Sequence, residues 1–287
     1  MESVGVSTVV KEEDNIASLG RREIRERKVH RLLFDNTKSY MLRVGSVAVF
    51  LAVWHILSTL NVMWPLQFGN LPTPMEVLRK WQEVAMSTNY YVNIMYSVYR
   101  VSLGIVLGLV SGVLMGIWLG LSARANNSMF PTFEIFRPIP LIAFLPIAML
   151  LFNTIEGGIV FITYIGAFFP ILITTRSAIK RVSPTLINAS KCLGCPPGKA
   201  VWMVYLPAAA PEIFSALTVG VGASWMGVIT AEMMAGQYGV GYYTWEAYQL
   251  MQYDDSIVGM FTIGVLGFLF SALVRLFEKI FVKWKNV

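Results

Sequence analysis

The residues best suited to chemistry lie in one polar stretch, NASKCLGCPPGKAVWMVYLP, at positions 188–207. Cys192 and Cys195 form a C-x-x-C pair, a spacing that metal sites and redox dithiols share. A structural zinc ion needs four ligands, whereas the sequence has no further cysteine and only two histidines, His30 and His55. We therefore expect no metal at this pair and no redox role for it.

The glycines of the same stretch suggest a phosphate-binding loop until their spacing is counted. A P-loop needs four residues between its glycines and a Ser or Thr after its lysine, to hold magnesium. Here three residues separate Gly194 from Gly198, and Ala200 follows Lys199. We therefore predict that this chain itself binds no ATP, no magnesium and no other cofactor.

The rest of the sequence contains few of the residue combinations that an enzyme needs. A membrane enzyme needs a nucleophile beside a base, or a metal cluster, and the apolar runs contain one histidine and no H-E-x-x-H sequence. Gly236, Gly239 and Gly241 lack the strand, turn and helix setting of a dinucleotide site, so they are expected to form an outer turn. We predict a non-catalytic protein with no catalytic residues.

The elements that carry these residues are strongly apolar. Hydrophobic residues make up 55% of the chain and charged residues 14%, whereas soluble domains carry roughly a quarter charged residues. A helix needs about 20 apolar residues to cross a bilayer. Six runs approach that length: about 42–62, 98–121, 139–152, 159–175, 214–235 and 257–282. We predict an all-α polytopic membrane protein with six transmembrane helices.

Prolines set the third run apart from the others. Pro138, Pro140 and Pro146 each lack a backbone N–H donor. We expect this helix to start directly after Arg137 and to kink near its middle. A kinked helix beside a translocation path could act as a gate, which makes Arg137, Pro138 and Pro140 candidate path residues; a static kink is the alternative.

Lysines and arginines indicate the orientation of the runs. They gather on one side: in residues 1–39, at Arg124, Arg137, Arg176, Lys180, Arg181, Lys191 and Lys199, and in residues 275–287. Because basic residues stay in the cytoplasm, we predict a multi-pass membrane protein with both termini cytoplasmic. The net charge of +6 then reflects topology and not nucleic-acid binding. Residues 1–39 form a basic extension, and residues 40–287 form the transmembrane domain.

Two features inside the runs have structural interpretations. Small residues recur every four positions in the second run, at Gly104, Gly108, Gly112, Gly116 and Gly120. This spacing favours close packing of another helix. Arg100 and Glu232 lie toward the outer face, and a charge in hydrocarbon costs about 3 kcal/mol, so we expect the two to form an ion pair. Contact with a solute on the path is the alternative for both residues.

The polar stretch belongs to a predicted cytoplasmic loop, about 179–211. Ser183 and Pro184 are suited to start a helix, and Gly194 is suited to the left-handed turn that ends one. A second short helix fits residues 198–205, stopped by Pro207. Together they predict a rigid helical hairpin.

This hairpin carries a family resemblance. Its pattern Asn188-Ala189-Ser190-x3-Gly194-x9-Val204-x-Leu206-Pro207 resembles the pattern Glu-Ala-Ala-x3-Gly-x9-Ile-x-Leu-Pro of the membrane subunits of type I ABC importers. The segments NLPTPMEVL, SVYRVSLGIVLGLVSG, RPIPLIAFLPIAMLLF and ITAEMMAGQYGVGYYTWEA are similar to those of the group that imports nitrate, sulfonates, taurine and bicarbonate. Asn188 replaces the acidic residue of the pattern.

The resemblance implies a permease subunit of the bacterial inner (plasma) membrane that forms the path for a small anionic solute. Its partners would be a second permease copy, two ATPase subunits that bind ATP and Mg, and an extracytoplasmic binding protein. The loop would couple to the ATPase through Asn188, Ala189, Ser190, Leu193, Gly194, Cys195, Gly198, Val204, Leu206 and Pro207. An ion-coupled secondary transporter that works without an ATPase is the alternative, and copurification of an ATPase distinguishes the two.

Overall fold

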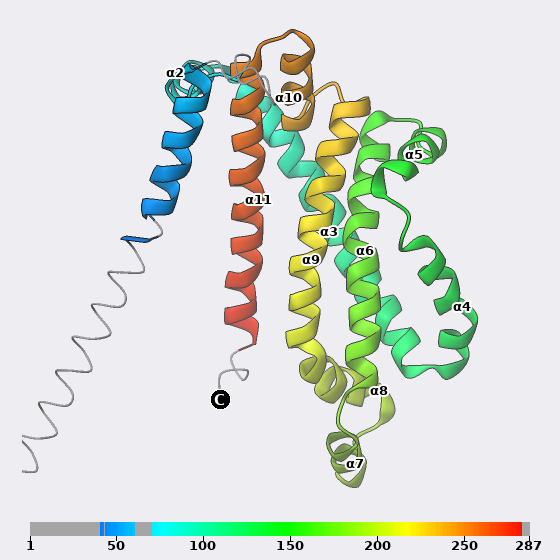
Figure 1. Cartoon of the computed structure of the whole chain (residues 1–287). Coiled ribbons are helices and arrows are strands. Elements are labelled where there is room, and N and C mark those ends of the chain that lie inside the picture. Colours follow the sequence, from blue (N-terminus) through cyan, green and yellow to red (C-terminus); the bar gives the residue numbers. More distant parts are fainter. Residues whose placement is uncertain (1–40, 43, 61–70, 283–287) are drawn as a thin grey trace, which may run out of the picture. The chain divides into compact units, whose positions relative to one another are not determined.

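The computed structural model (Figure 1) describes residues 41–42, 44–60 and 71–282, and it divides into two units, Met1–Pro74 and Met75–Val287. The predicted extension of residues 1–39 lies outside the described residues. In the first unit, the apolar helix Val44–Thr59 matches the first predicted span but is shorter. The predicted end of that span, residues 61–62, also lies outside the described part. Trp54 Nε1 donates to the carbonyl of Pro72 at 3.2 Å.

The regular elements described in the second unit are all helical. Four are long and apolar enough to cross a membrane: α3 (Thr88–Leu121), α6 (Ile155–Lys180), the continuous run Pro197–Ala235 that includes α9 (Leu206–Ala235), and α11 (Tyr253–Phe281). Each matches a predicted span and begins earlier than predicted. The shorter elements are α2 (Pro74–Val84), α4 (Ala123–Phe136), η2 (Leu141–Phe144), α5 (Leu145–Leu151), α7 (Pro184–Cys192), α8 (Pro197–Ala200), η3 (Val201–Tyr205) and α10 (Val240–Gln249).

The third predicted span has a different shape from the one expected. Instead of one helix kinked near its middle, the chain has α4, a break, and then η2 and α5, with a bend of 101° between α4 and α5. Pro138 and Pro140 lack the N–H donors that a continuous helix needs, so the break falls there. Pro146 lies in the first turn of α5, where no intrahelical donor is required. The bent pair carries the chain back along the bundle (Figure 1), and by length and composition the two helices together qualify as a fifth candidate span.

The glycine stripe of α3 packs against α6, which confirms the predicted helix contact. Each glycine faces one α6 side chain, and these side chains repeat with the same spacing: Thr163, Ala167, Ile171, Thr175 and Ile179. A β-carbon at Gly108 would come within 2.6 Å of the Ala167 Cβ. The two helices therefore approach each other more closely than larger residues on α3 would allow.

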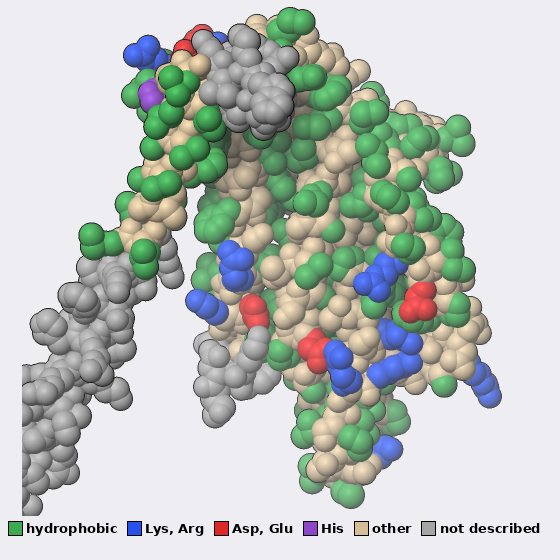
Figure 2. All heavy atoms as spheres, viewed as in Figure 1, with side chains coloured by type: hydrophobic (Ala, Val, Ile, Leu, Met, Phe, Trp, Pro, Cys, Tyr) green, Lys and Arg blue, Asp and Glu red, His purple; other side chains and the backbone are tan. Residues whose placement is uncertain are grey.

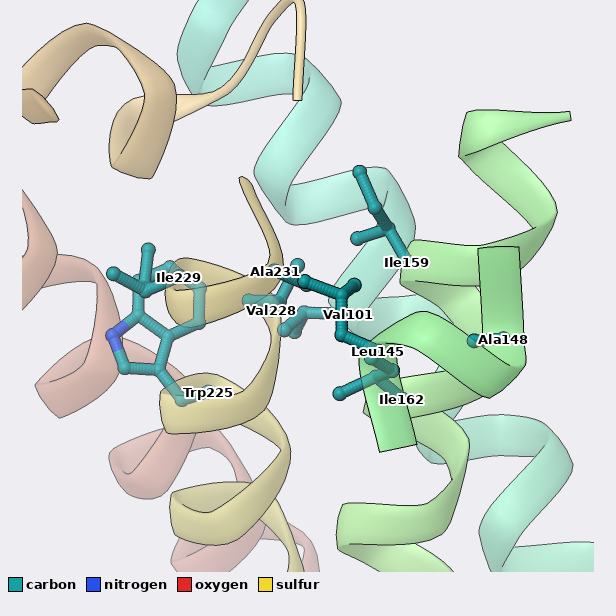
Figure 3. Close-up of a cluster of buried hydrophobic side chains, with 9 residues drawn as sticks. All are labelled: Val101, Leu145, Ala148, Ile159, Ile162, Trp225, Val228, Ile229 and Ala231. Atoms are coloured by element: carbon teal, nitrogen blue, oxygen red, sulfur yellow. The ribbon is translucent and has the colours of Figure 1, made fainter. Parts of the chain in front are cut away.

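A buried apolar core joins α3, α5, α6 and α9 toward the end of the unit that carries α10 (Figure 3). Its members are Val101, Leu145, Ala148, Ile159, Ile162, Trp225, Val228, Ile229 and Ala231. Trp225 Nε1 also donates to the carbonyl of Ile263 at 3.0 Å, which ties α9 to α11. Lipid tails are as apolar as these side chains, so the core stabilises the bundle mainly through close packing.

Basic side chains gather at the opposite end, where α3, α6 and α11 finish and α9 begins (Figures 1 and 2). They include Arg124, Arg176, Lys180, Arg181, Lys191, Lys199, Arg275 and Lys279. The α7–α8 hairpin projects from this end of the unit (Figure 1). Of the basic residues predicted to face the cytoplasm, the fold brings these eight to one end of the bundle. Arg137, predicted with them, instead lies beside the middle of α6.

Candidate functional site

The first helix of the hairpin begins and ends where the sequence predicts. Ser183 caps α7 by accepting a hydrogen bond from the Thr185 N–H at 3.3 Å, and Pro184 occupies the first turn. At the other end Gly194 has φ 73°, a conformation that favours glycine. The Cys195 N–H donates to the Ser190 carbonyl at 3.0 Å and closes the turn. Both ends of α7 are therefore fixed by local hydrogen bonds.

The second half of the hairpin corrects the prediction that Pro207 stops a helix. The helix begins at α8, widens into a π turn at η3, and continues through α9 to Ala235. The N–H of Leu206 donates to the Val201 carbonyl, five residues back. A π turn leaves room for an extra residue in the helix. Pro207 therefore follows it in the first turn of α9, where its missing donor interrupts no helical bond.

The hairpin and the π turn that follows it expose apolar side chains. Leu193 is 87% exposed, Trp202 64% and Met203 69%. Of the predicted coupling residues, the exposed ones are Asn188, Ala189, Leu193, Gly194 and Gly198. Ser190 is buried, and Cys195, Val204, Leu206 and Pro207 are partly buried. The fold therefore brings all ten onto α7, its turn and the start of the following helix.

The cysteines of the hairpin are both free thiols, Cys192 exposed and Cys195 partly buried. The Cys195 Sγ lies 3.7 Å from the carbonyl of its neighbour Pro196. Within the described ranges, no group of three or more His, Cys, Asp or Glu side chains is placed to hold a metal ion.

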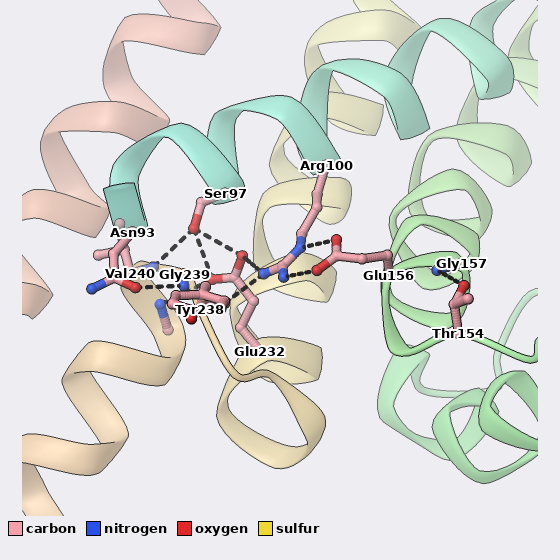
Figure 4. Close-up of polar contacts among 11 residues, drawn as sticks. Asn93, Ser97, Arg100, Thr154, Glu156, Gly157, Glu232, Tyr238, Gly239 and Val240 are labelled. Carbon is pink, nitrogen blue, oxygen red and sulfur yellow. Dashed lines mark hydrogen bonds and ion pairs between the residues drawn. The ribbon is translucent and has the colours of Figure 1, made fainter. Parts of the chain in front are cut away.

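A second site lies within the bundle and centres on Arg100 of α3, which is fully buried (Figure 4). Its Nη1 donates to Glu232 Oε1 of α9 at 2.8 Å and to the Tyr238 carbonyl at 2.6 Å. The ion pair with Glu232 confirms the pairing expected from the sequence. The opposite edge of the guanidinium, Nε and Nη2, donates to both oxygens of Glu156 at 2.8 and 2.5 Å.

Glu232 is held by the glycine-rich turn between α9 and α10. Ser97 Oγ lies 2.8 Å from each of its oxygens, and the Gly241 N–H donates to Oε2 at 3.0 Å. The Val240 N–H in turn donates to Ser97 Oγ, and the Gly239 N–H donates to Asn93 Oδ1. The turn predicted at positions 236–241 is therefore present, and it encloses the carboxylate of Glu232.

Sequence reasoning missed the contribution of Glu156 to this cluster. Glu156 lies in the first turn of α6, directly after the cap residue Thr154, whose side chain accepts from the Gly157 N–H at 3.2 Å. The sequence places Glu156 on the same outer side as Arg100 and Glu232, but apart from the glycine stripe it contains no signal for how α3 and α6 approach one another. The glycine stripe on α3, which sets that approach, was the available clue.

The five candidate path residues fall in two separate places. Arg100 and Glu232 form the buried cluster, whereas Arg137 lines a groove of about 310 Å³ beside α6 and α9. Pro138 and Pro140 are exposed at the break that precedes η2. The residues around the groove are otherwise mainly apolar, among them Leu141, Ile165 and Val219.

A polar recess of about 730 Å³ lies at the α10 end of the unit. Tyr243 Oη donates to Asp255 Oδ1 at 2.7 Å, and Lys80 Nζ lies 3.5 Å from Asp255 Oδ2. Burial, followed by the hydrogen bond to Asp255, raises the pKa of the Tyr243 phenol. Tyr243 therefore remains a neutral hydrogen-bond donor in the lining of the recess.

Comparison with known proteins agrees with this architecture. Residues 104–287 match the family described as binding-protein-dependent transport system inner membrane component. The chain is 28% identical over 253 residues to the taurine transport system permease protein TauC of Escherichia coli, covering 86% of this chain and 91% of TauC. It is 29% identical over 265 residues to the nitrate import permease protein NrtB of Synechocystis sp., covering 89% and 94%.

A solved structure supports the fold assignment. A chain of the inward-facing MetNI methionine ABC transporter superposes with a TM-score of 0.56 at 20% identity, covering 67% of this chain and 93% of the other. The match shows a shared type I ABC importer fold. Together with the family match over residues 104–287, it leads to one conclusion: the chain belongs to the binding-protein-dependent transport system inner membrane components, the permeases of ABC importers.

Proposed function

We propose that this chain forms the translocation path of an ATP-driven importer for a small anionic solute of the nitrate, bicarbonate, taurine or sulfonate type. The observation that carries this function is the α7–α8 hairpin, with a capped start at Ser183 and a left-handed end at Gly194. A rigid hairpin transmits motion between subunits, whereas a flexible loop would absorb it.

The exposed apolar side chains of the hairpin and of the π turn after it are the proposed contact with a separate ATPase subunit. Leu193, Trp202 and Met203 provide an exposed apolar surface at the basic end of the bundle. Apolar patches of this kind mark interaction surfaces. ATP and Mg would be bound by that partner, and closure of two such partners would move α6 and α9 through the hairpin.

The remaining assembly follows from the family and the charge distribution. We assign the hairpin end to the cytoplasm, because basic residues gather there, and the opposite end to the outer face. The polar recess near Tyr243 and Asp255 then lies where an extracytoplasmic binding protein delivers the solute. A second copy of the chain completes the path in the inner membrane, and both termini face the cytoplasm.

The anionic solute is proposed from the named relatives. TauC is a taurine permease and NrtB a nitrate permease, and each aligns with more than four fifths of this chain. Both solutes carry oxyanion groups. Arg100 provides a cation in the membrane region that suits such a group, and its fork geometry matches planar oxygen pairs.

Reconstitution tests the proposal. The chain, expressed with its genomic neighbours, should copurify with an ATPase subunit from detergent, and proteoliposomes of that complex should take up nitrate, taurine or bicarbonate only with ATP and a binding protein. Uptake by the chain alone, driven by an ion gradient, would instead establish a secondary transporter. Selective import of a cation or a neutral sugar would overturn the anionic solute class.

A further inference from the structure

We infer that Glu156 is a tethered occupant of an oxyanion site on Arg100, and that a small monovalent oxyanion takes the same edge of the guanidinium when Glu156 swings away. This inference rests on the proposed anion transport, and it adds a binding residue, a competitor and a ligand geometry to it.

Glu156 occupies one edge of the Arg100 guanidinium with the geometry of a bound oxyanion. Glu156 Oε2 accepts from Arg100 Nε at 2.8 Å, and Oε1 accepts from Nη2 at 2.5 Å. Such a two-point fork is the arrangement in which arginine binds planar oxyanions. Nitrate and bicarbonate present a comparable pair of oxygens, and a sulfonate can present two of its three. A free oxyanion can therefore replace the carboxylate without any movement of Arg100.

The two carboxylates of the cluster are held very differently. Glu232 is fully buried and receives hydrogen bonds from Arg100, Ser97 and the Gly241 N–H. Glu156 has a side chain that is 46% exposed, and both of its oxygens bond to Arg100. Leaving the fork would thus move Glu156 into an accessible space, whereas Glu232 would lose a fixed cradle. Glu156 is the exchangeable partner.

Charge balance also indicates that Glu156, and not Glu232, is the exchangeable carboxylate. Arg100 and Glu232 already neutralise each other inside the bundle, so the cluster does not need Glu156 to balance a buried cation. A monovalent oxyanion in the fork restores the same local charge that Glu156 supplies. The guanidinium itself is fixed by Glu232, by the Tyr238 carbonyl and by the Tyr96 ring, whose centroid lies 5.2 Å from Arg100 Cζ.

The tether has a functional consequence. A solute must compete with a carboxylate that is always near the fork, so its apparent affinity is its intrinsic affinity multiplied by the fraction of time that the fork is free. Weak, exchangeable binding suits a transport path, because a deep binding site would slow release. Removing the tethered carboxylate should therefore strengthen binding and slow delivery.

Anion titration of the purified full-length chain tests this inference. We would measure the thermal unfolding midpoint in detergent against sodium nitrate and sodium methanesulfonate, with sodium chloride keeping the ionic strength constant. For Glu156→Gln, we expect the half-saturating concentration to fall at least about tenfold below that of the wild type, because the competitor is lost. Glu83→Gln is the matched control: its side chain is 72% exposed and pairs with Lys80, outside the cluster. It should titrate like the wild type.

Two further variants separate binding from folding. Arg100→Lys keeps the charge but loses the fork, so it should not respond to either anion. Glu156→Asp keeps an acid that is too short for the same two bonds and should give an intermediate shift. If Arg100→Lys does not fold, the comparison of Glu156→Gln with Glu83→Gln still decides the question.

Equal titrations for Glu156→Gln and the wild type, or no response of Glu156→Gln to either anion, would overturn the inference. Its failure is distinguishable from failure of the proposed function. Anion uptake by the wild-type complex without a shift in Glu156→Gln refutes the tethered site alone. A shift in Glu156→Gln without anion uptake by the complex supports the site and refutes the transport function.

Discussion

Gly239 lies against the carboxylate of Glu232 so closely that a β-carbon at Gly239 would come within 2.2 Å of Glu232 Cδ. The backbone at Gly239 also has φ 126°, in the region that L side chains rarely adopt. One glycine thus provides both the space for the Glu232 cradle and the chain reversal that forms it.

The first prediction concerns this contact. Gly239→Ala should lower the stability of the detergent-purified protein, by about 1–3 kcal/mol from the backbone conformation alone and by more from the collision with Glu232. Thermal unfolding measures the effect. Gly222→Ala on α9 is the control, because a β-carbon there has no neighbour within 4 Å. Equal midpoints for the two variants would contradict the cradle.

The buried ion pair gives the second prediction. Arg100→Ala should destabilise the protein by roughly 3–5 kcal/mol, because it leaves the buried Glu232 without its cation. Glu232→Gln should destabilise it less, because Arg100 keeps its pair with the half-exposed Glu156. Arg181→Ala removes one member of the exposed pair with Glu212 and should change stability by about 0–1 kcal/mol. Size-exclusion profiles and thermal midpoints provide the comparison. A stable Arg100→Ala protein would show that the pair contributes little to folding.

The helix contact gives the third prediction. Gly116→Val should disrupt packing of α3 on α6, because a β-carbon would come within 2.6 Å of Thr175 Cβ. Overpacking typically costs about 1–3 kcal/mol, and more against a backbone that cannot move. Gly264→Val on α11 introduces the same side chain where no atom lies within 4 Å, and it should remain folded. The yield of monodisperse protein reports the difference.

The fourth prediction concerns coupling. Gly194→Val should place a β-branched side chain at φ 73°, straining the end of α7 by about 1–3 kcal/mol. Transport and solute-stimulated ATPase activity should fall together, at least about tenfold, while the spans still insert. Gly222→Ala on α9 lies outside the hairpin, at a site where an added β-carbon has no neighbour within 4 Å, and it should remain coupled. Full coupling in Gly194→Val would count against docking by the hairpin.

The cysteines of the hairpin provide a companion test. Replacing Cys192 and Cys195 together by serine should leave transport unchanged, because both are free thiols and neither forms a disulfide. Loss of activity in the double variant, with normal expression, would indicate that the thiols have a role after all.

The fifth prediction concerns orientation. In this cysteine-free background, single cysteines at Thr88 and at Lys199 should react with a membrane-impermeant maleimide from opposite sides. Thr88 begins α3, and Lys199 lies on the hairpin at the other end of the bundle. Lys199 should label only in inside-out vesicles or lysed cells, and label at both positions from the same side would refute the topology.

Much of the fold could be predicted because it depends on residues that lie close together in the sequence. Apolar runs of sufficient length give α3, α6, α9 and α11, because backbone groups in lipid must be satisfied within the helix. The cap at Ser183 and the turn at Gly194 are also local, since each depends on hydrogen bonds within a few residues. The glycine spacing on α3 predicted a close helix neighbour, although it could not name α6.

Elements that depend on geometry at a proline were predicted less well. The bend before η2 and the continuation past Pro207 both depend on how the neighbouring turns adjust to the backbone N–H that proline lacks. The presence of a proline shows that a donor is missing. It does not show whether the chain breaks, as at Pro138, or widens into a π turn that keeps the helix intact.

The sequence by itself determined that this is a helical membrane protein with a capped hairpin, because hydropathy, caps and turn glycines act over short distances. Only the tertiary structure decided that Arg100 binds two carboxylates, one buried and one half-exposed. Arg100 and Glu156 lie 56 positions apart, and their contact depends on how closely two helices pack. The turn at Gly239 then orients Glu232, and such long-range register has no signature in the order of residues along the chain.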